Sequence, residues 1–78
     1  MDKNEFYLVL QTITIGLINK IIVETGFYED IAMEKLYTSE LYSVLEKEET
    51  KVWHYSVPKL YDLWINETKT GQLSLPAF

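Results

Sequence analysis

Apolar residues near the start of the chain recur every three or four positions, which is the spacing of a buried α-helical face. Asp2 precedes this run as an N-cap, and Gly26 follows it where a glycine commonly ends a helix. The pattern therefore predicts a helix from about residue 3 to Thr25. Residues 12–15 (TITI) would also fit a strand, but the spacing over the whole run favours the helix. The predicted buried face is Phe6, Val9, Leu10, Ile13, Leu17 and Ile21.

A second group of apolar residues lies on another side of the same helix: Leu8, Ile15, Ile18 and Ile22. At about 100° per residue, polar or small residues separate the two groups. A helix that is apolar on two sides has to be covered on both, and 78 residues are barely enough to do so. We therefore predict that Ile15, Ile18 and Ile22 contact a second copy of the chain, as a homodimer, or a protein partner.

The following residues carry signals for two or three further helices. Glu29 and Asp30 form an acidic first turn, and helical apolar spacing continues to Leu45. Thr38 or Ser39 could cap a new helix or bend a continuing one.

The last helix has the clearest end signals. Ser56 is placed as its N-cap, Pro58 fits its first turn, and Gly71 ends it. Taken together, the helical segments predict a single all-α domain, residues 1–78, of three to four helices.

Residues 50–56 (TKVWHYS) show no helical period, and we predict that they form a short extended crossover between helices. In this interpretation Trp53 and Tyr55 pack in the core, while His54 lies at its boundary. The tail, residues 72–78, could pair with the crossover as a minimal two-stranded ladder or pack as extended chain.

The net charge of the chain argues against some classes of partner. The 78 residues contain 7 Lys and Arg against 12 Asp and Glu, which gives a net charge of −5. Nucleic-acid phosphates and anionic lipids require a basic face, so we expect neither as a partner. Gln11, Asn19 and Lys20 interrupt the apolar first segment, which argues against a membrane span. The expected location is the cytoplasm.

The sequence shows no arrangement of catalytic or metal-binding residues. It has no cysteine, which removes disulfides and thiolate metal sites. The one histidine, His54, has no nucleophile, carboxylate or further ligand at a recognisable spacing. We therefore expect a protein that is not an enzyme and has no catalytic residues, metal or cofactor.

Residues 32–76 (AMEKLYTSELYSVLEKEETKVWHYSVPKLYDLWINETKTGQLSLP) resemble short helical bacterial proteins of an uncharacterised family. The resemblance covers just over half of the chain. It implies a helical fold, a bacterial cytosolic origin and a partner-binding role of the kind found beside toxin-type genes. It implies no site residues.

These observations predict a small protein–protein interaction or regulatory module that buries an apolar and aromatic patch. Tyr37 and Tyr42 join the candidate interface, because tyrosine buries a large area while keeping a polar tip. The alternative is a nucleic-acid-related regulator, either a DNA mimic or a weak DNA binder whose last helix offers only Lys59 and Lys69. An enzyme centred on His54 is a third alternative.

Overall fold

Helices make up most of residues 2–75, the part of the chain that the computed structural model describes. The predicted all-α class is confirmed, and no strand occurs among these residues. In chain order the elements are α1 (Lys3–Thr25), α2 (Glu29–Tyr37), α3 (Glu40–Leu45), the 3-10 turns η1 (Glu48–Thr50) and η2 (Val52–His54), and α4 (Val57–Thr70).

The predicted first helix is confirmed at both ends. Asp2 accepts a hydrogen bond from the backbone N–H of Glu5 at 2.9 Å, which satisfies one free donor of the first turn. Gly26 adopts a left-handed conformation with φ +77°, and its N–H donates to the carbonyl of Ile22. Residues 12–15 are helical, so the strand alternative is wrong.

The later helices also begin and end at the predicted residues. Ser39 accepts from the N–H of Tyr42 and so caps a new helix, α3, instead of bending α2. Ser56 accepts from the N–H of Lys59 at the start of α4, and Gly71 ends that helix with φ +79°. The break at Ser39 divides the middle of the chain into two short helices.

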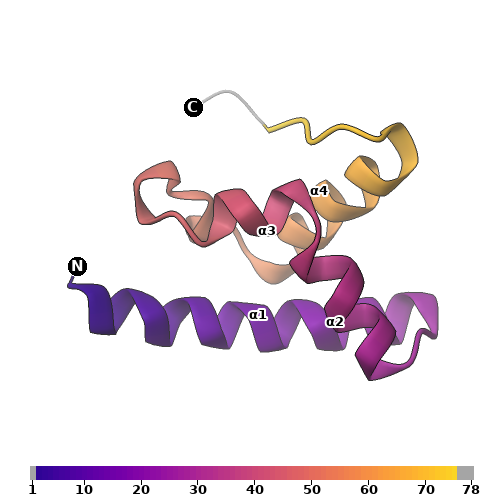
Figure 1. The fold of residues 1–78 in the computed structure, drawn as a ribbon, viewed down its shortest axis with the longest axis horizontal. Coiled ribbons are helices and arrows are strands. Elements are labelled where there is room, and N and C mark those ends of the chain that lie inside the picture. Colours follow the sequence, from indigo (N-terminus) through magenta and orange to yellow (C-terminus); the bar gives the residue numbers. More distant parts are fainter. Residues whose placement is uncertain (1, 76–78) are drawn as a thin grey trace.

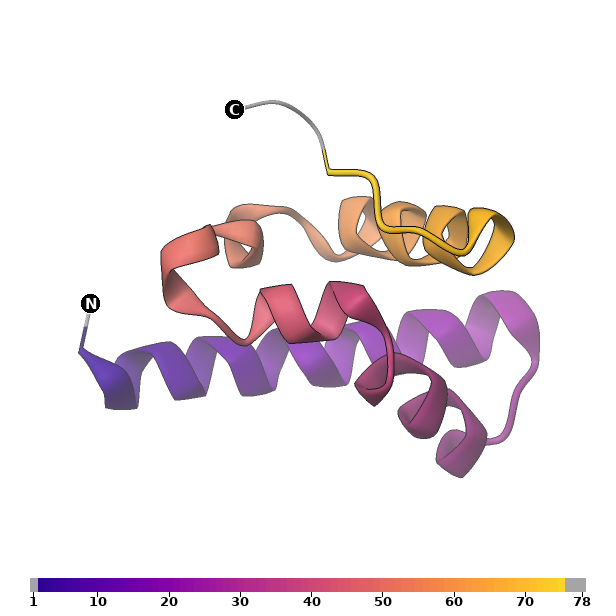
Figure 2. The same ribbon diagram turned by 45° about the horizontal axis from the view of Figure 1, so that its top comes forward.

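One hydrophobic cluster joins the helices. Figures 1 and 2 show α1 running along the length of the molecule; α4 and α2 pack on it, while α3 packs on α2 and α4. The buried side chains of the cluster are Phe6, Leu10, Leu17, Ile18, Ile21, Ala32, Leu36, Leu41, Leu45, Val52, Leu60, Leu63 and Trp64.

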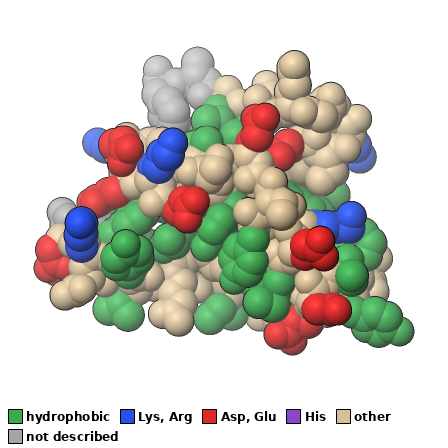
Figure 3. Space-filling model, in the orientation of Figure 1, with side chains coloured by type: hydrophobic (Ala, Val, Ile, Leu, Met, Phe, Trp, Pro, Cys, Tyr) green, Lys and Arg blue, Asp and Glu red, His purple; other side chains and the backbone are tan. Residues whose placement is uncertain are grey.

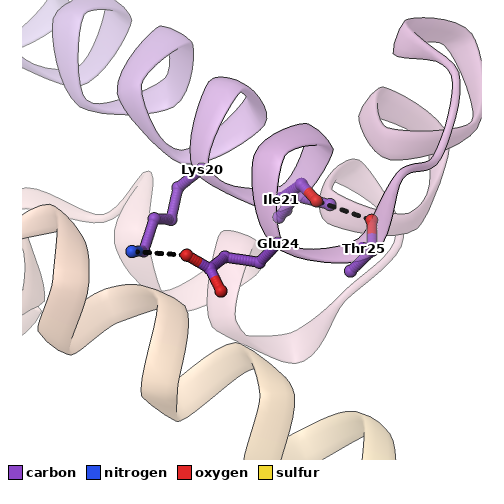
Figure 4. A network of polar contacts seen from close by, with 4 residues as sticks. All are labelled: Lys20, Ile21, Glu24 and Thr25. Carbon is purple, nitrogen blue, oxygen red and sulfur yellow. Dashed lines mark hydrogen bonds and ion pairs between the residues drawn. The ribbon is translucent and has the colours of Figure 1, made fainter.

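The contact between α1 and α4 is close. A Cβ atom built on Gly16 would lie only 3.1 Å from Cγ2 of Val57, so the glycine lets the two helices approach. One turn later, the Lys20 ammonium lies 5.7 Å from the ring centroid of Tyr61 and forms an ion pair with Glu24 at 3.0 Å (Figure 4). Apolar packing and one cation–π contact therefore hold this side of α1 on α4.

A carboxylate from α4 caps α3. Glu67 accepts hydrogen bonds from the backbone N–H groups of Glu40 and Leu41, each at 2.9 Å. These are donors of the first helical turn, which have no partner inside the helix. The tertiary cap fixes the start of α3 against the end of α4.

The crossover between α3 and α4 differs from the prediction. Residues 48–54 form two 3-10 turns, and only Tyr55 and Ser56 after them are extended. Lys51 joins the turns in a left-handed conformation with φ +59°. Thr50 supports them, because its hydroxyl donates to the carbonyls of Val44 and Lys47. Turns of three residues are too short to show a period in the sequence.

The side chains of the crossover largely follow the prediction. Trp53 and Tyr55 are half-buried against the core, and His54 is exposed and stacks on Trp53 at 4.1 Å between ring centroids. A fully extended segment would place Val52 on the same side as His54, but Val52 is fully buried, because the 3-10 turn rotates neighbouring side chains by roughly 120°. The predicted pairing with the tail is not formed by residues 72–75, and residues 76–78 lie outside the described part.

By length and composition alone, α1 would also be able to cross a membrane. In the structure, 33% of the residues in its most apolar window are buried inside the protein. Core helices of soluble proteins and N-terminal signal sequences share these properties.

Candidate functional site

An open groove of about 570 Å³ lies between α1 on one side and α2 with α3 on the other. On the face drawn in Figure 3, hydrophobic side chains gather over these helices, with carboxylates among them. The groove is lined by Tyr7, Leu10, Gln11, Thr14, Ile15, Ile18, Asn19, Glu29, Met33, Tyr37, Tyr42 and Glu46. We call this surface the α1–α2–α3 groove.

The floor of the groove is one row of α1 residues spaced four apart: Leu10, Thr14 and Ile18. All three are buried, with Ile18 only 8% exposed. Thr14 is polar but tolerates burial, because its hydroxyl donates to the carbonyl of Leu10 at 2.7 Å. The floor is therefore part of the core.

A second row of α1 residues forms one wall: Tyr7, Gln11, Ile15 and Asn19. These side chains have the same four-residue spacing but project further from the core. Tyr7 is 61% exposed and Ile15 is 55% exposed. A large apolar side chain and an aromatic ring thus stand unburied beside an apolar floor.

The opposite wall comes from α2 and α3. Glu29, Met33 and Tyr37 form a four-residue row along α2, and Tyr42 and Glu46 continue the wall at α3. The break at Ser39 brings Tyr37 and Tyr42 together as an edge-to-face pair, with ring centroids 4.9 Å apart. Tyr37 remains 45% exposed, so the pair presents aromatic surface to the groove.

The structure brings together four of the five predicted interface residues. Ile15, Ile18, Tyr37 and Tyr42 all line the groove, although they come from three helices. The prediction that Ile15, Ile18 and Ile22 form one free stripe is wrong. Ile18 belongs to the core, and Ile22 packs against it outside the groove, because α2 covers this part of α1.

Among residues 2–75, the charged side chains that line the groove are both acidic. Glu29 and Glu46 are exposed, and the lining residues within 2–75 include no Lys, Arg or His. The wall of α2 and α3 runs in the opposite direction to α1, as Figures 1 and 2 show. Glu29 begins α2 and Glu46 directly follows α3, so the two carboxylates lie at the two ends of this wall.

The sequence prediction missed several lining residues. Tyr7, Gln11 and Asn19 share the four-residue spacing of Ile15, and this spacing was the signal that could have found them. Met33 is related to Tyr37 in the same way. The carboxylates of Glu29 and Glu46 could not be assigned to the groove from spacing, because their position depends on how α2 and α3 pack.

A second, smaller hollow lies at the crossover and contains His54. Its lining residues are Glu48, Glu49, Lys51, Trp53 and His54, and the indole N–H of Trp53 donates to the carbonyl of Glu48 at 2.9 Å. Among residues 2–75, no three His, Cys, Asp or Glu side chains gather as a metal site. The Trp53–His54 stack, with ring centroids 4.1 Å apart, supports the crossover.

Comparison with known proteins gives no relative from which a role could be transferred. The chain matches no protein-family model, no curated protein and no solved structure. The family resemblance of residues 32–76 therefore stays a prediction, and the role of the groove has to be argued from its own residues.

Proposed function

We propose that this chain is a small protein–protein interaction module that binds its partner in the α1–α2–α3 groove. The observation that carries the proposal is the convergence of exposed Ile15 and the Tyr37–Tyr42 pair on one apolar floor. Aromatic and aliphatic side chains around a preformed depression are the usual anchors of a protein interface. Binding would bury surface that the chain alone leaves in water.

The lining favours binding of a protein segment over catalysis or capture of a small molecule. Small-molecule sites enclose most of their ligand, whereas the walls here include side chains as exposed as Tyr7 and Ile15. The carboxylates of the lining, Glu29 and Glu46, are both exposed, without the difference in environment that separates a general acid from a general base. We therefore propose a non-enzymatic role.

We place this role in the cytoplasm. The apolar face of α1 packs in the domain core, where Leu17 and Ile21 are fully buried. That burial supports a soluble protein, in which α1 holds the fold together and the groove binds the partner.

A matched pair of substitutions on α1 tests the proposal. Ile15→Glu places a charge in the groove, whereas Leu8→Glu places the same charge at a residue that is 66% exposed and does not line it. Tagged wild-type, Ile15→Glu and Leu8→Glu proteins would be captured from the host at equal expression. We expect a stoichiometric partner with the wild type and Leu8→Glu, and loss of that partner with Ile15→Glu.

Circular dichroism of the three proteins controls for folding, since both positions are exposed and both variants should keep wild-type helicity. Equal recovery of the partner by all three proteins would place the interface elsewhere and contradict the proposal.

A further inference from the structure

The two carboxylates that line the groove, Glu29 and Glu46, indicate the chemistry of its partner. We propose that the α1–α2–α3 groove takes a basic amphipathic helix, with an apolar stripe flanked at each end by Lys or Arg. This inference rests on the proposed function and specifies the class of partner. It follows from the shape of the two walls, the length of the groove and the sign of its charges.

The walls of the groove favour a helix as the occupant. Both walls consist of helical rows with four-residue spacing: Tyr7, Gln11, Ile15 and Asn19 on one side, and Glu29, Met33 and Tyr37 on the other. The ridges of a third helix pack between such rows. A helix-in-groove contact uses apolar anchors at i, i+3 or i+4, and i+7, which would reach the floor at Leu10 and Ile18.

The length of the groove sets the size of the segment. The α1 wall runs from Tyr7 to Asn19, which are twelve positions apart on one helix. At 1.5 Å per residue this is about 18 Å, or roughly three turns of an occupying helix. A segment of this length places three or four apolar residues over the floor and its flanking residues near the two ends.

The flanking residues would meet Glu29 at one end and Glu46 at the other, because Glu29 begins α2 and Glu46 directly follows α3, at the two ends of this wall. Both are exposed, and no cation among the lining residues within 2–75 pairs with them. Lys or Arg beside each end of the apolar stripe complements this arrangement and speeds encounter with a chain of net charge −5.

The same charges disfavour a second copy of this chain as the occupant. Two grooves that faced each other would bring together two copies of Glu29 and two of Glu46, with no lining lysine to compensate. The chain has 7 basic against 12 acidic residues, so other orientations also meet a predominantly acidic surface. Like charges across an interface suppress such pairing.

Selection of displayed peptides tests the inference without knowledge of the natural partner. The library would hold helical peptides of about 14 residues with a fixed leucine stripe, and with Lys, Gln or Glu allowed at both flanks. The full-length wild-type protein is the bait, and Ile15→Glu is the counter-selection. We expect enrichment of Lys at both flanks, and binding at least about tenfold weaker to Ile15→Glu.

The affinity of the best peptide for charge variants of the protein then shows which carboxylates its Lys residues contact. Glu29→Gln and Glu46→Gln should each weaken binding by about two- to fivefold, the range of exposed ion pairs, and the effect should shrink in high salt. Glu34→Gln is the matched control, because Glu34 is an exposed carboxylate of α2 that does not line the groove. It should change the affinity by less than about twofold.

The outcomes separate this inference from the proposed function. Peptides that depend on Ile15 but show no basic flanks, and bind Glu29→Gln and Glu46→Gln like wild type, would overturn the basic helix and leave the interaction groove standing. Failure to select any peptide that depends on Ile15 would overturn the helix as the occupant, whereas the proposed function is decided separately by capture with Ile15→Glu and Leu8→Glu. A dimer of the free protein that Ile15→Glu dissociates, measured by sedimentation, would make a second copy the occupant and also overturn the inference.

Discussion

The two long sides of α1 are covered very differently. On one side α4 approaches so closely that a Cβ on Gly16 would press against Val57, and Lys20 lies over the ring of Tyr61. On the other side α2 packs on α1, but the chain then breaks at Ser39 and continues as α3, which packs on α2 and α4. The first side is closed, and the second side contains the groove.

Helix length explains much of this difference. The 23 residues of α1 span about 34 Å, and the 14 residues of α4 span about 21 Å in one piece. The 9 residues of α2 and the 6 of α3 are separate rods of about 13 and 9 Å. Two short rods with a bend between them cannot follow a straight helix closely. In a chain this small, a capped break in the middle therefore leaves an apolar groove without any large loop.

The largest expected effect comes from the closed side. Leu60 of α4 is fully buried, so Leu60→Ala should lower the free energy of unfolding by about 3 kcal/mol through lost burial and the cavity left behind. Leu8→Ala, at the exposed surface of α1, should change it by less than about 0.5 kcal/mol. Urea unfolding followed by circular dichroism measures both. Similar losses for the two variants would mean that α4 does not close a true core.

We expect an intermediate effect from Glu67, the residue of α4 that caps α3 and so positions part of the groove wall. Glu67→Ala removes the cap on the N–H groups of Glu40 and Leu41, and should cost about 1–2 kcal/mol. The exposed Asp62 of the same helix serves as control, and Asp62→Ala should be nearly neutral. Hydrogen exchange provides a second readout, since the amides of Glu40 and Leu41 should exchange faster only in Glu67→Ala. Unchanged exchange rates of these amides in Glu67→Ala would mean that Glu67 does not hold the start of α3.

The features that the sequence predicts correctly are local. Asp2 and Gly26 mark α1 because each bonds within four residues of itself, and Ser39 and Ser56 cap helices for the same reason. Glu67 could not be found in this way, since its partner amides lie 26 and 27 residues earlier in the chain. The contribution of a residue becomes unpredictable from spacing once its partner belongs to another element.

The candidate site shows the same difference between features set by local sequence and features set by tertiary packing. Helical spacing predicted Ile15, and the chemistry of tyrosine predicted Tyr37 and Tyr42, as candidate interface residues. Their convergence on one groove depends on the angle at which α2 meets α3. A pattern of residue types places Thr14 among the polar residues between the two apolar groups of α1, because it does not show that the hydroxyl donates to the carbonyl of Leu10 and so permits burial. Ile18 was assigned to a partner for a similar reason, since the coverage of α1 by α2 is a tertiary fact.

The smallest expected effect tests whether charge helps to close the α4 side. Lys20 lies over Tyr61 and is itself paired with Glu24, in a partly exposed position. A double-mutant cycle of Lys20→Met and Tyr61→Leu should give a coupling energy of about 0.5 kcal/mol, since methionine keeps an apolar stem of similar length. Apolar burial around Leu60 would then outweigh the cation–π contact several-fold. A coupling of about 2 kcal/mol or more would contradict this several-fold difference and make the Lys20–Tyr61 contact a principal interaction between α1 and α4.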